Sequence, residues 1–99
     1  MTQESGYKRE VRVDLAEGLH LRPLSQIAKR AMQFASEINI VKGERSLNAK
    51  STIDLLTLEA KCGTELIVEA SGEDAQIAVE AIVLLFETGF PIDGELPPV

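Results

Sequence analysis

The order of the hydrophobic patterns along the chain constrains its fold more than any other feature of the sequence. Residues 8–15 alternate apolar and charged side chains, which is the period of a strand with one buried face. Between residues 21 and 35 apolar side chains recur every three or four positions, as in a helix that packs on a sheet, and the stripe comprises Leu24, Ile27, Ala28, Ala31 and Ala35. A strand followed at once by an amphipathic helix favours a fold of two layers, with helices lying on a sheet.

The next segment predicts a tight hairpin between two strands. Residues 37–42 and 45–50 both have strand-like composition, and only Gly43 and Glu44 separate them. Glycine at the first central position suits a type II′ turn, whose twist matches that of the strands it joins. Two strands joined in this way run antiparallel.

The rest of the chain predicts a short helix, a strand and a longer helix. Ser51 can accept a hydrogen bond from the early N–H groups of a helix that continues to about Leu58, and Asp54 can reach back to the start of that helix. A strand over residues 65–70 and a helix that opens at residues 71–74 follow. The expected buried stripe of the last helix comprises Ile77, Ala78, Ala81, Ile82 and Leu85.

These elements follow the order β-α-β-β-α-β-α and predict an α+β domain, in which helices cover one face of a mainly antiparallel sheet. The 99 residues suffice for one core and no second domain. We expect the folded domain to span residues 1–88. Residues 89–99 contain three prolines and two glycines, and we expect them to form an extended or poorly ordered tail.

The composition excludes several functional classes. A single histidine and a single cysteine cannot build a zinc site from the usual nitrogen and sulfur ligands, and we expect neither a metal nor a cofactor. The formal net charge of −6 argues against nonspecific nucleic-acid binding. No apolar run reaches the ~18 residues of a membrane span and no leader pattern opens the chain, so we expect a cytoplasmic protein without membrane insertion.

The net charge conceals a gradient along the chain. Residues 1–50 carry a balance of +3, whereas residues 51–99 carry a balance of −9. An anionic ligand is therefore expected to meet the first half of the chain.

The only histidine, His20, lies where the first predicted strand gives way to the first predicted helix. The N-terminus of a helix carries unpaired N–H groups and a partial positive charge, which bind anions and favour the neutral, nucleophilic form of an imidazole. Pro23 suits the first turn, because the N–H that it lacks has no partner inside the helix there. Arg22 adds a guanidinium that can bind a phosphoryl group. A lone histidine at a helix start can equally be a cap or a surface residue.

Two sequence blocks resemble one known family. The segment Gly18-Leu19-His20-Leu21-Arg22-Pro23 is similar to the active-site signature of HPr, the histidine-containing phosphocarrier of the bacterial phosphoenolpyruvate-dependent sugar phosphotransferase system. The block Ser46-Leu47-Asn48-Ala49-Lys50-Ser51 resembles a second segment of that family, and the resemblance extends from about Tyr7 to Glu87. The fold that it implies is an open-faced sandwich of four antiparallel strands with three helices on one face.

The resemblance implies that the protein is a covalent relay. His20 would take a phosphoryl group from phosphorylated enzyme I on ring nitrogen Nδ1 and pass it to an enzyme II A component, while Arg22 would stabilise the phosphate. The carrier would be a monomer that is consumed and regenerated stoichiometrically, rather than an enzyme that turns over a substrate. Its partners would supply the magnesium and the catalytic machinery.

The second block contains the position that matches the family's regulatory phosphoserine, which is Ser51 here. Capping of the short helix is an equally direct role for this residue. Asp54 stands where the family commonly has glycine, and its carboxylate would repel both a phosphate on Ser51 and an acidic kinase surface. If Ser51 is modified, a serine kinase or a transcriptional regulator joins the expected partners.

Five residues make up the docking surface that the resemblance implies around His20. Leu21 and Leu24 replace the small alanines usual beside the Arg-Pro pair of the family. Thr52, Ile53 and Leu56 occupy the helix face that docks partners in the family. Packing in the core is the alternative role of these three residues.

Two other functions are compatible with parts of the sequence. A regulatory HPr-like protein would bind a kinase or a transcription factor through the Ser51 helix, although that role alone would not require both His20 and Arg22. An RNA-binding module of similar size would need a basic and aromatic strand signature that is absent here, and its charge would have the opposite sign. The sequence therefore favours the phosphocarrier.

Overall fold

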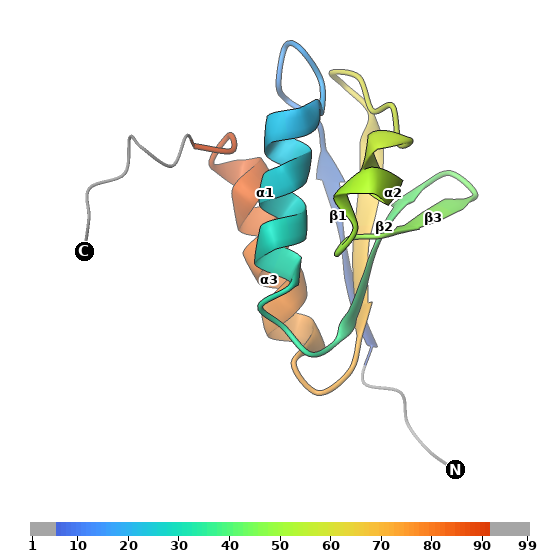
Figure 1. Ribbon diagram of the computed structural model, residues 1–99, viewed down its shortest axis with the longest axis vertical. Coiled ribbons are helices and arrows are strands. Elements are labelled where there is room, and N and C mark those ends of the chain that lie inside the picture. Colours follow the sequence, from blue (N-terminus) through green and yellow to red (C-terminus); the bar gives the residue numbers. More distant parts are fainter. Residues whose placement is uncertain (1–5, 92–99) are drawn as a thin grey trace.

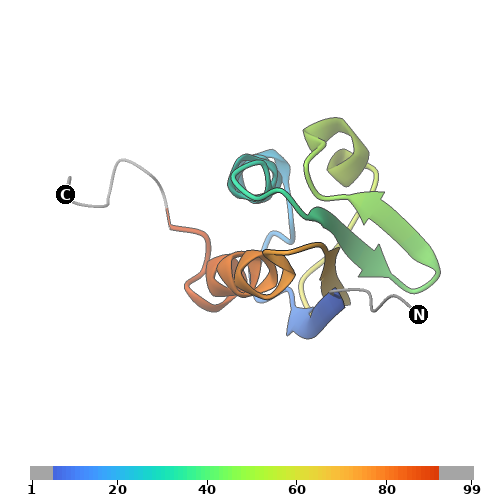
Figure 2. The ribbon, with the colours of Figure 1, turned by 90° about the horizontal axis from the view of Figure 1, so that it is seen from below.

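Four antiparallel strands form one open sheet, and three helices cover one of its faces (Figure 1). The computed structural model describes residues 6–91. The elements are, in chain order, β1 (Gly6–Arg12), α1 (Leu21–Ala31), β2 (Glu37–Lys42), β3 (Arg45–Asn48), α2 (Thr52–Leu56), β4 (Glu65–Ser71) and α3 (Ala75–Glu87). The predicted α+β class, the element order and the two layers, which Figure 2 shows end-on, are confirmed.

The strands lie in the order β1-β4-β2-β3, so the last strand of the chain is inserted between the first two. Val68 of β4 lies opposite Arg9 of β1 on one side and opposite Ile40 of β2 on the other. Because successive side chains of a strand point to opposite faces, Leu66, Val68 and Ala70 all face the helices and are buried. The residues between them are exposed or half-buried, so the other face of the sheet meets solvent.

The core lies between this sheet and the helices α1 and α3. The spacing predicted Leu24, Ile27, Ala28 and Ala31 on the buried face of α1, and the structure buries these four together with Pro23. Ala35, the fifth residue of the predicted stripe, lies beyond the helix and is exposed. The buried face of α3 contains Ala78 and Ile82 of the predicted stripe, together with Ala75, Val79, Val83 and Phe86. Ala81 and Leu85, which were also predicted, are half-buried. Ile77, which was expected in the core, is 66% exposed. None of the helices within residues 6–91 combines the length and the apolar character needed to cross a membrane.

The strand ends differ from the prediction by two or three residues. β1 pairs with β4 only as far as Arg12, although Val13 is still buried and its N–H donates to the chain just before β4. β3 ends two residues early, at Asn48, because the side-chain oxygen of Asn48 accepts from the N–H two residues later and turns the chain. The glycine of the predicted hairpin turn, Gly43, has the positive φ that a type II′ turn requires, +60°.

α1 ends at Ala31 rather than at the predicted Ala35, because the loop that follows it is held by the start of α3. The N–H groups of Ala35 and Ser36 both donate to the carboxylate of Asp74 at 2.9 Å. The hydroxyl of Ser36 donates to the same carboxylate. These hydrogen bonds, that of the hydroxyl foremost, hold the pKa of Asp74 below its ordinary value of 3.8.

β1 is tied to α3 as well as to β4. The hydroxyl of Tyr7 and the guanidinium of Arg9 both donate to the carboxylate of Glu80 at 2.8 Å. The hydrogen bond from Tyr7, followed by that from Arg9, lowers the pKa of Glu80 from its ordinary value of 4.5. Because β1 is an edge strand that pairs only with β4, these bonds give it a second attachment to the domain.

The chain after α3 packs back on the domain. Phe90 is 2% exposed, and its ring meets that of Phe86 edge-to-face with 4.9 Å between the ring centroids. Residues 89–91, the start of the predicted tail, therefore belong to the packed domain, which corrects the boundary predicted between residues 88 and 89. The remainder of the predicted tail lies outside the described residues.

Candidate functional site

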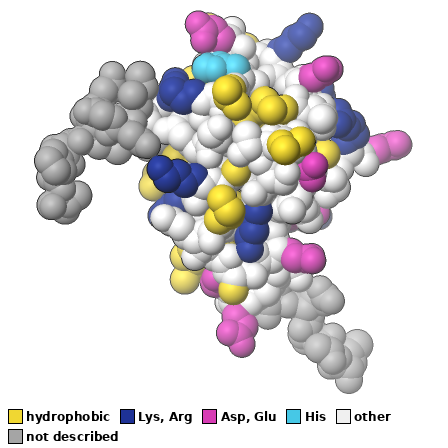
Figure 3. Space-filling view, viewed as in Figure 1, with side chains coloured by type: hydrophobic (Ala, Val, Ile, Leu, Met, Phe, Trp, Pro, Cys, Tyr) yellow, Lys and Arg dark blue, Asp and Glu magenta, His cyan; other side chains and the backbone are white. Residues whose placement is uncertain are grey.

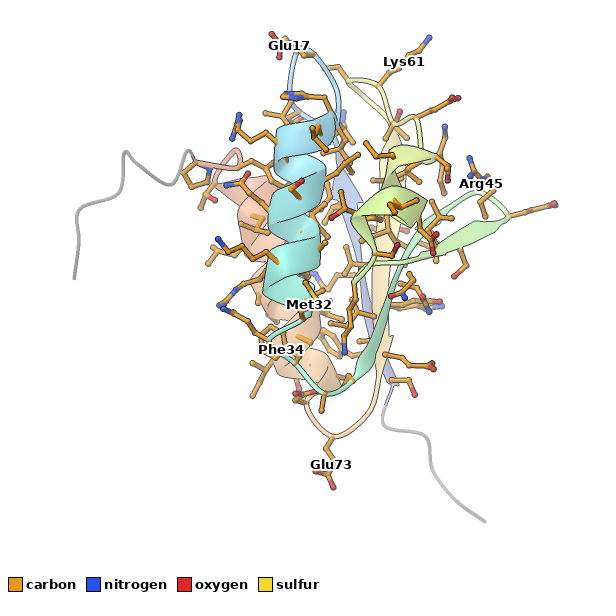
Figure 4. All side chains as sticks on the ribbon, viewed as in Figure 1. Glu17, Met32, Phe34, Arg45, Lys61 and Glu73 are labelled. Atoms are coloured by element: carbon orange, nitrogen blue, oxygen red, sulfur yellow. The ribbon has the colours of Figure 1, made fainter. Side chains whose placement is uncertain are left out.

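His20 stands directly before α1, at the N-cap position, and its side chain is 42% exposed. Its backbone is extended, with φ of −119° and ψ of −169°, and its ring makes no capping hydrogen bond to the helix. Nε2 lies 3.4 Å from Oε1 of Glu17, which is labelled at the tip of the preceding loop in Figure 4. Nδ1 has no hydrogen-bond partner among the described residues.

The loop that carries His20 is anchored on the chain that precedes β4. The N–H of Leu19 donates to the carbonyl of Ala60 at 2.8 Å, and Gly18 next to it has φ of +74°. A Cβ on Gly18 would lie 2.7 Å from the same carbonyl oxygen, closer than real Cβ atoms come. Both the backbone angle and the available space therefore require glycine here.

The first turn of α1 has the donors of an anion site. The first hydrogen bond of the helix runs from the N–H of Leu24 to the carbonyl of His20, at 3.0 Å. The N–H groups of Leu21 and Arg22 therefore have no partner inside the helix, and Pro23 has no N–H. These donors stand at the positive end of the helix dipole. A phosphoryl group on the adjacent imidazole is chemically suited to this turn.

The guanidinium of Arg22 is anchored through one nitrogen only. Nη1 donates to the carbonyl of Phe90 at 3.0 Å and to Oε1 of Gln26 at 3.4 Å. Nε and Nη2 have neither a hydrogen bond nor an ion pair with any described residue. The fold thus keeps Arg22 in the turn next to His20 without a direct bond between the two side chains.

An exposed apolar patch, formed by Leu21, Ile53 and Leu56, adjoins His20 on the face of the molecule that Figure 3 shows. These side chains are 58%, 77% and 47% exposed, and a gathering of this kind marks an interaction surface more often than a scattered leucine does. Thr52, in the same helix as Ile53, is half-buried. Leu24, predicted at the rim of this patch, is only 2% exposed, because it lies on the buried stripe of α1. The prediction of a partner contact was wrong for Leu24.

Ser51 caps α2 as predicted, with its Oγ accepting from the N–H of Asp54 at 3.1 Å. The expected reciprocal bond is absent, because the N–H of Ser51 donates to the carbonyl of Asn48 at 3.1 Å instead of to the Asp54 carboxylate. The half-buried hydroxyl therefore has a structural role, and the carboxylate of Asp54 stands within the same turn.

Comparison with known proteins agrees with the resemblance seen in the sequence. The family model described as "PTS HPr component phosphorylation site" matches residues 7–88. The chain belongs to the HPr family. The phosphocarrier protein HPr of Haemophilus influenzae is 44% identical over 82 residues, which make up 83% of this chain and 96% of that protein.

Solved structures of the HPr family share the fold. The histidine-containing phosphocarrier protein of a mycoplasma has a TM-score of 0.80 at 35% identity, and the match covers 85% of this chain and 97% of that one. The catabolite repression protein Crh of Bacillus subtilis, described as a dimer with a swapped domain, has a TM-score of 0.65 at 31% identity over 94% of this chain and all of that one. This HPr-family chain is a phosphocarrier protein of the phosphotransferase system.

Three residues in contact with the site had no predicted role. Glu17 precedes His20 by three positions, and Gln26 follows Arg22 by four on one helix face, so their spacing was a usable signal. Phe90 contacts Arg22 across a separation of 68 positions. No local pattern in the sequence points to that contact.

Proposed function

We propose that this HPr-family protein accepts a phosphoryl group on Nδ1 of His20 from phosphorylated enzyme I and passes it to an enzyme II A component. The observation that carries the proposal is an exposed imidazole directly before a helix whose first N–H groups lack partners. Arg22 adds a cation in the same turn. The family match over residues 7–88 supports the same function.

Phosphoryl transfer at His20 needs no proton to move on the ring. The lone pair of Nδ1 attacks phosphorus, the P–Nδ1 bond forms, and the bond between phosphorus and the donor breaks with its electron pair leaving on the donor. Nε2 keeps its hydrogen, and the Glu17 carboxylate is the nearest acceptor on that side of the ring. The second transfer reverses these events when a nucleophile of the enzyme II A component attacks phosphorus.

The phosphoryl group brings negative charge that the first turn of α1 can stabilise. The N–H groups of Leu21 and Arg22 and the Arg22 guanidinium are suited to charge-assisted hydrogen bonds with its oxygens. Because His20 is exposed, both partners can approach phosphorus directly and can contribute magnesium and catalytic groups of their own.

We further propose that the apolar patch of Leu21, Ile53 and Leu56 docks enzyme I and the enzyme II A component in turn, with Thr52 at its border. Each docking event would bury the patch and keep water away from the phosphoryl group. One surface that serves two partners fits a carrier that works as a monomer and meets them one after the other. The cytoplasm is the compartment that we propose for this relay.

A second candidate function is regulatory, and the similarity to Crh favours it. In that role α2 would bind a serine kinase or a transcriptional regulator, and Ser51 would be the site of modification. The Asp54 carboxylate in the same turn opposes a second negative charge on Ser51. The joint presence of His20 and Arg22 favours the relay as the main function.

The test is to incubate the purified full chain with phosphoenolpyruvate, magnesium and enzyme I from several bacteria, since the exposed Leu21 stands where the family usually has a small alanine. We expect an acid-labile phosphoryl adduct that is absent from His20→Ala and retained in Ser51→Ala. Arg22→Ala should slow the transfer by about 10- to 100-fold, because a hydrogen bond to a charged group contributes about 1.5–3 kcal/mol. A stable phosphoester, or an undiminished adduct in His20→Ala, would contradict the proposal.

A further inference from the structure

The chain that follows α3 returns to the turn that carries His20, and it does so beyond residue 88, where the family match ends. Two successive carbonyls of this segment face α1. That of Phe90 accepts from Nη1 of Arg22 at 3.0 Å, and that of Pro91 accepts from Nε2 of Gln26 at 2.6 Å. Gln26 also offers its Oε1 to Nη1 of Arg22 at 3.4 Å. The segment, Gln26 and Arg22 therefore form one connected network.

The core holds these carbonyls in place. The ring of Phe90 is buried against that of Phe86, and the N–H of Phe90 donates to the carbonyl of Leu85 at 2.9 Å. Phe90 also has φ of +55°, a conformation that residues other than glycine rarely adopt. The buried ring and the bonded N–H thus hold the residue whose carbonyl accepts from Arg22.

The network leaves one edge of the Arg22 guanidinium open. Its two bonds, to Phe90 and to Gln26, both come from Nη1, which has two hydrogens. Nε and Nη2 have no partner among the described residues. These two nitrogens lie on the same edge of the planar group and can donate two parallel hydrogen bonds to a phosphate.

We infer that Phe90, Pro91 and Gln26 form a latch that orients Arg22 for the phosphoryl group on His20. The latch holds Nη1 and leaves the edge of Nε and Nη2 to the phosphate. The Arg22 side chain is therefore already ordered when the phosphoryl group arrives, and binding the phosphate costs less conformational entropy. Phe90 and Gln26 are positioning residues that act through Arg22. This inference rests on the proposed phosphorylation of His20.

The experiment compares Phe90→Ala, Phe90→Leu and Gln26→Leu with the wild-type chain and with Gln76→Leu as a matched control. Gln76 is exposed on α3 and makes no hydrogen bond to the described residues of the network. Each variant is made with Arg22 present and with Arg22→Ala. One readout is the hydrolysis rate of the purified phosphorylated protein, and the other is the NMR order parameter of the Arg22 Nε–H in the unphosphorylated protein.

We expect Phe90→Ala and Gln26→Leu to speed hydrolysis about 2- to 12-fold, the fold-change equivalent to about 0.5–1.5 kcal/mol for ordering one long side chain. Phe90→Leu, which keeps a large apolar anchor, and Gln76→Leu should behave like the wild type. In the Arg22→Ala background the same changes should have no effect. The Nε–H order parameter of Arg22 should fall in the two latch variants and stay at the wild-type value in Phe90→Leu and Gln76→Leu.

Unchanged hydrolysis and an unchanged order parameter in both latch variants would overturn the inference. An equal increase of hydrolysis in the Arg22→Ala background would overturn it as well, because the segment would then act only on the fold. If Phe90→Ala fails to fold, Gln26→Leu tests the inference, because Gln26 is only half-buried. If the wild-type chain is never phosphorylated, the proposed function fails, while the order parameter still shows whether the latch holds Arg22.

Discussion

At the scale of the single residue, Gly18 is the position that tolerates least change near His20. It combines a positive φ with a backbone carbonyl where a Cβ would lie. Gly43, in the β2–β3 turn, has a similar φ of +60° but open space around it. The two glycines therefore separate the effect of the backbone angle from the effect of crowding.

Gly18→Ala should lower the free energy of unfolding by more than Gly43→Ala does. Both alanines would bear about 1–3 kcal/mol for a positive φ, and only the first would also displace the carbonyl of Ala60. Urea denaturation of both variants measures the difference. Equal losses of stability would show that the loop can move away from Ala60 without cost.

Leu21 and Leu24 show how far the burial of a single side chain can be predicted from the sequence. The helical spacing alone assigned Leu24 to the buried stripe, whereas the family resemblance moved it to the docking rim. The structure buries Leu24 and exposes Leu21, so the spacing was right. The hydrogen bond from Arg22 to the carbonyl of Phe90 could not be predicted from the sequence, because it depends on how the segment after α3 packs on the folded core.

At the scale of the element, α2 presents most of its surface to solvent. It has five residues, and only Leu55 is buried. Its start is fixed by the Ser51 cap rather than by an extensive apolar face. Most of its side chains therefore remain available for contacts with other proteins.

Ile53→Ser should raise the KM of enzyme I for this protein, whereas Ile77→Ser should not. Both isoleucines are exposed, but Ile53 belongs to the apolar patch beside His20 and Ile77 lies on α3. Loss of one anchor from an interface costs about 1–2 kcal/mol, which is a factor of about 5–30. Steady-state phosphorylation of both variants gives the comparison, and equal KM values would remove Ile53 from the docking surface.

α3 shows why the sequence predicted a helix but not its orientation. Besides the buried Val79 and Val83, α3 has apolar side chains at Ile77, Leu84 and Leu85. Two different apolar stripes therefore fit the helical spacing equally well. Packing against β1 and β4 selects the second stripe. The element was therefore predictable from local pattern, and its inward face depended on contacts that only the complete fold makes.

At the scale of the whole molecule, two carboxylates join segments that are far apart in the chain. Asp74 holds the loop after α1, and Glu80 holds β1. Hydrogen bonds lower the pKa of both groups, from 3.8 for Asp74 and from 4.5 for Glu80. The ionised forms are therefore the ones that stabilise the folded chain.

The stability of the protein should fall as the pH drops below about 4.5. A carboxyl whose pKa is lower in the folded chain stabilises it fully above the unfolded value, and this contribution is lost as the pH falls through the folded value. Asp74→Asn and Glu80→Gln should each flatten the decline. Glu73→Gln, beside Asp74 and directed away from the domain in Figure 4, is the control and should not. Urea denaturation between about pH 2.5 and about pH 7, which brackets the ordinary pKa values of both carboxyl groups, measures the effect. Parallel curves for all variants would contradict the assignment.

The position of β4 also sets the order in which a chain leaving the ribosome can complete its site. β1 has no strand partner except β4, and the loop with His20 is bonded through Leu19 to Ala60, close to the start of β4. Synthesis proceeds from the N-terminus, so His20 emerges long before the residues that support it. A nascent chain therefore carries its histidine without this support until β4, which ends at Ser71, has been made, and the contact of Arg22 with Phe90 forms later still.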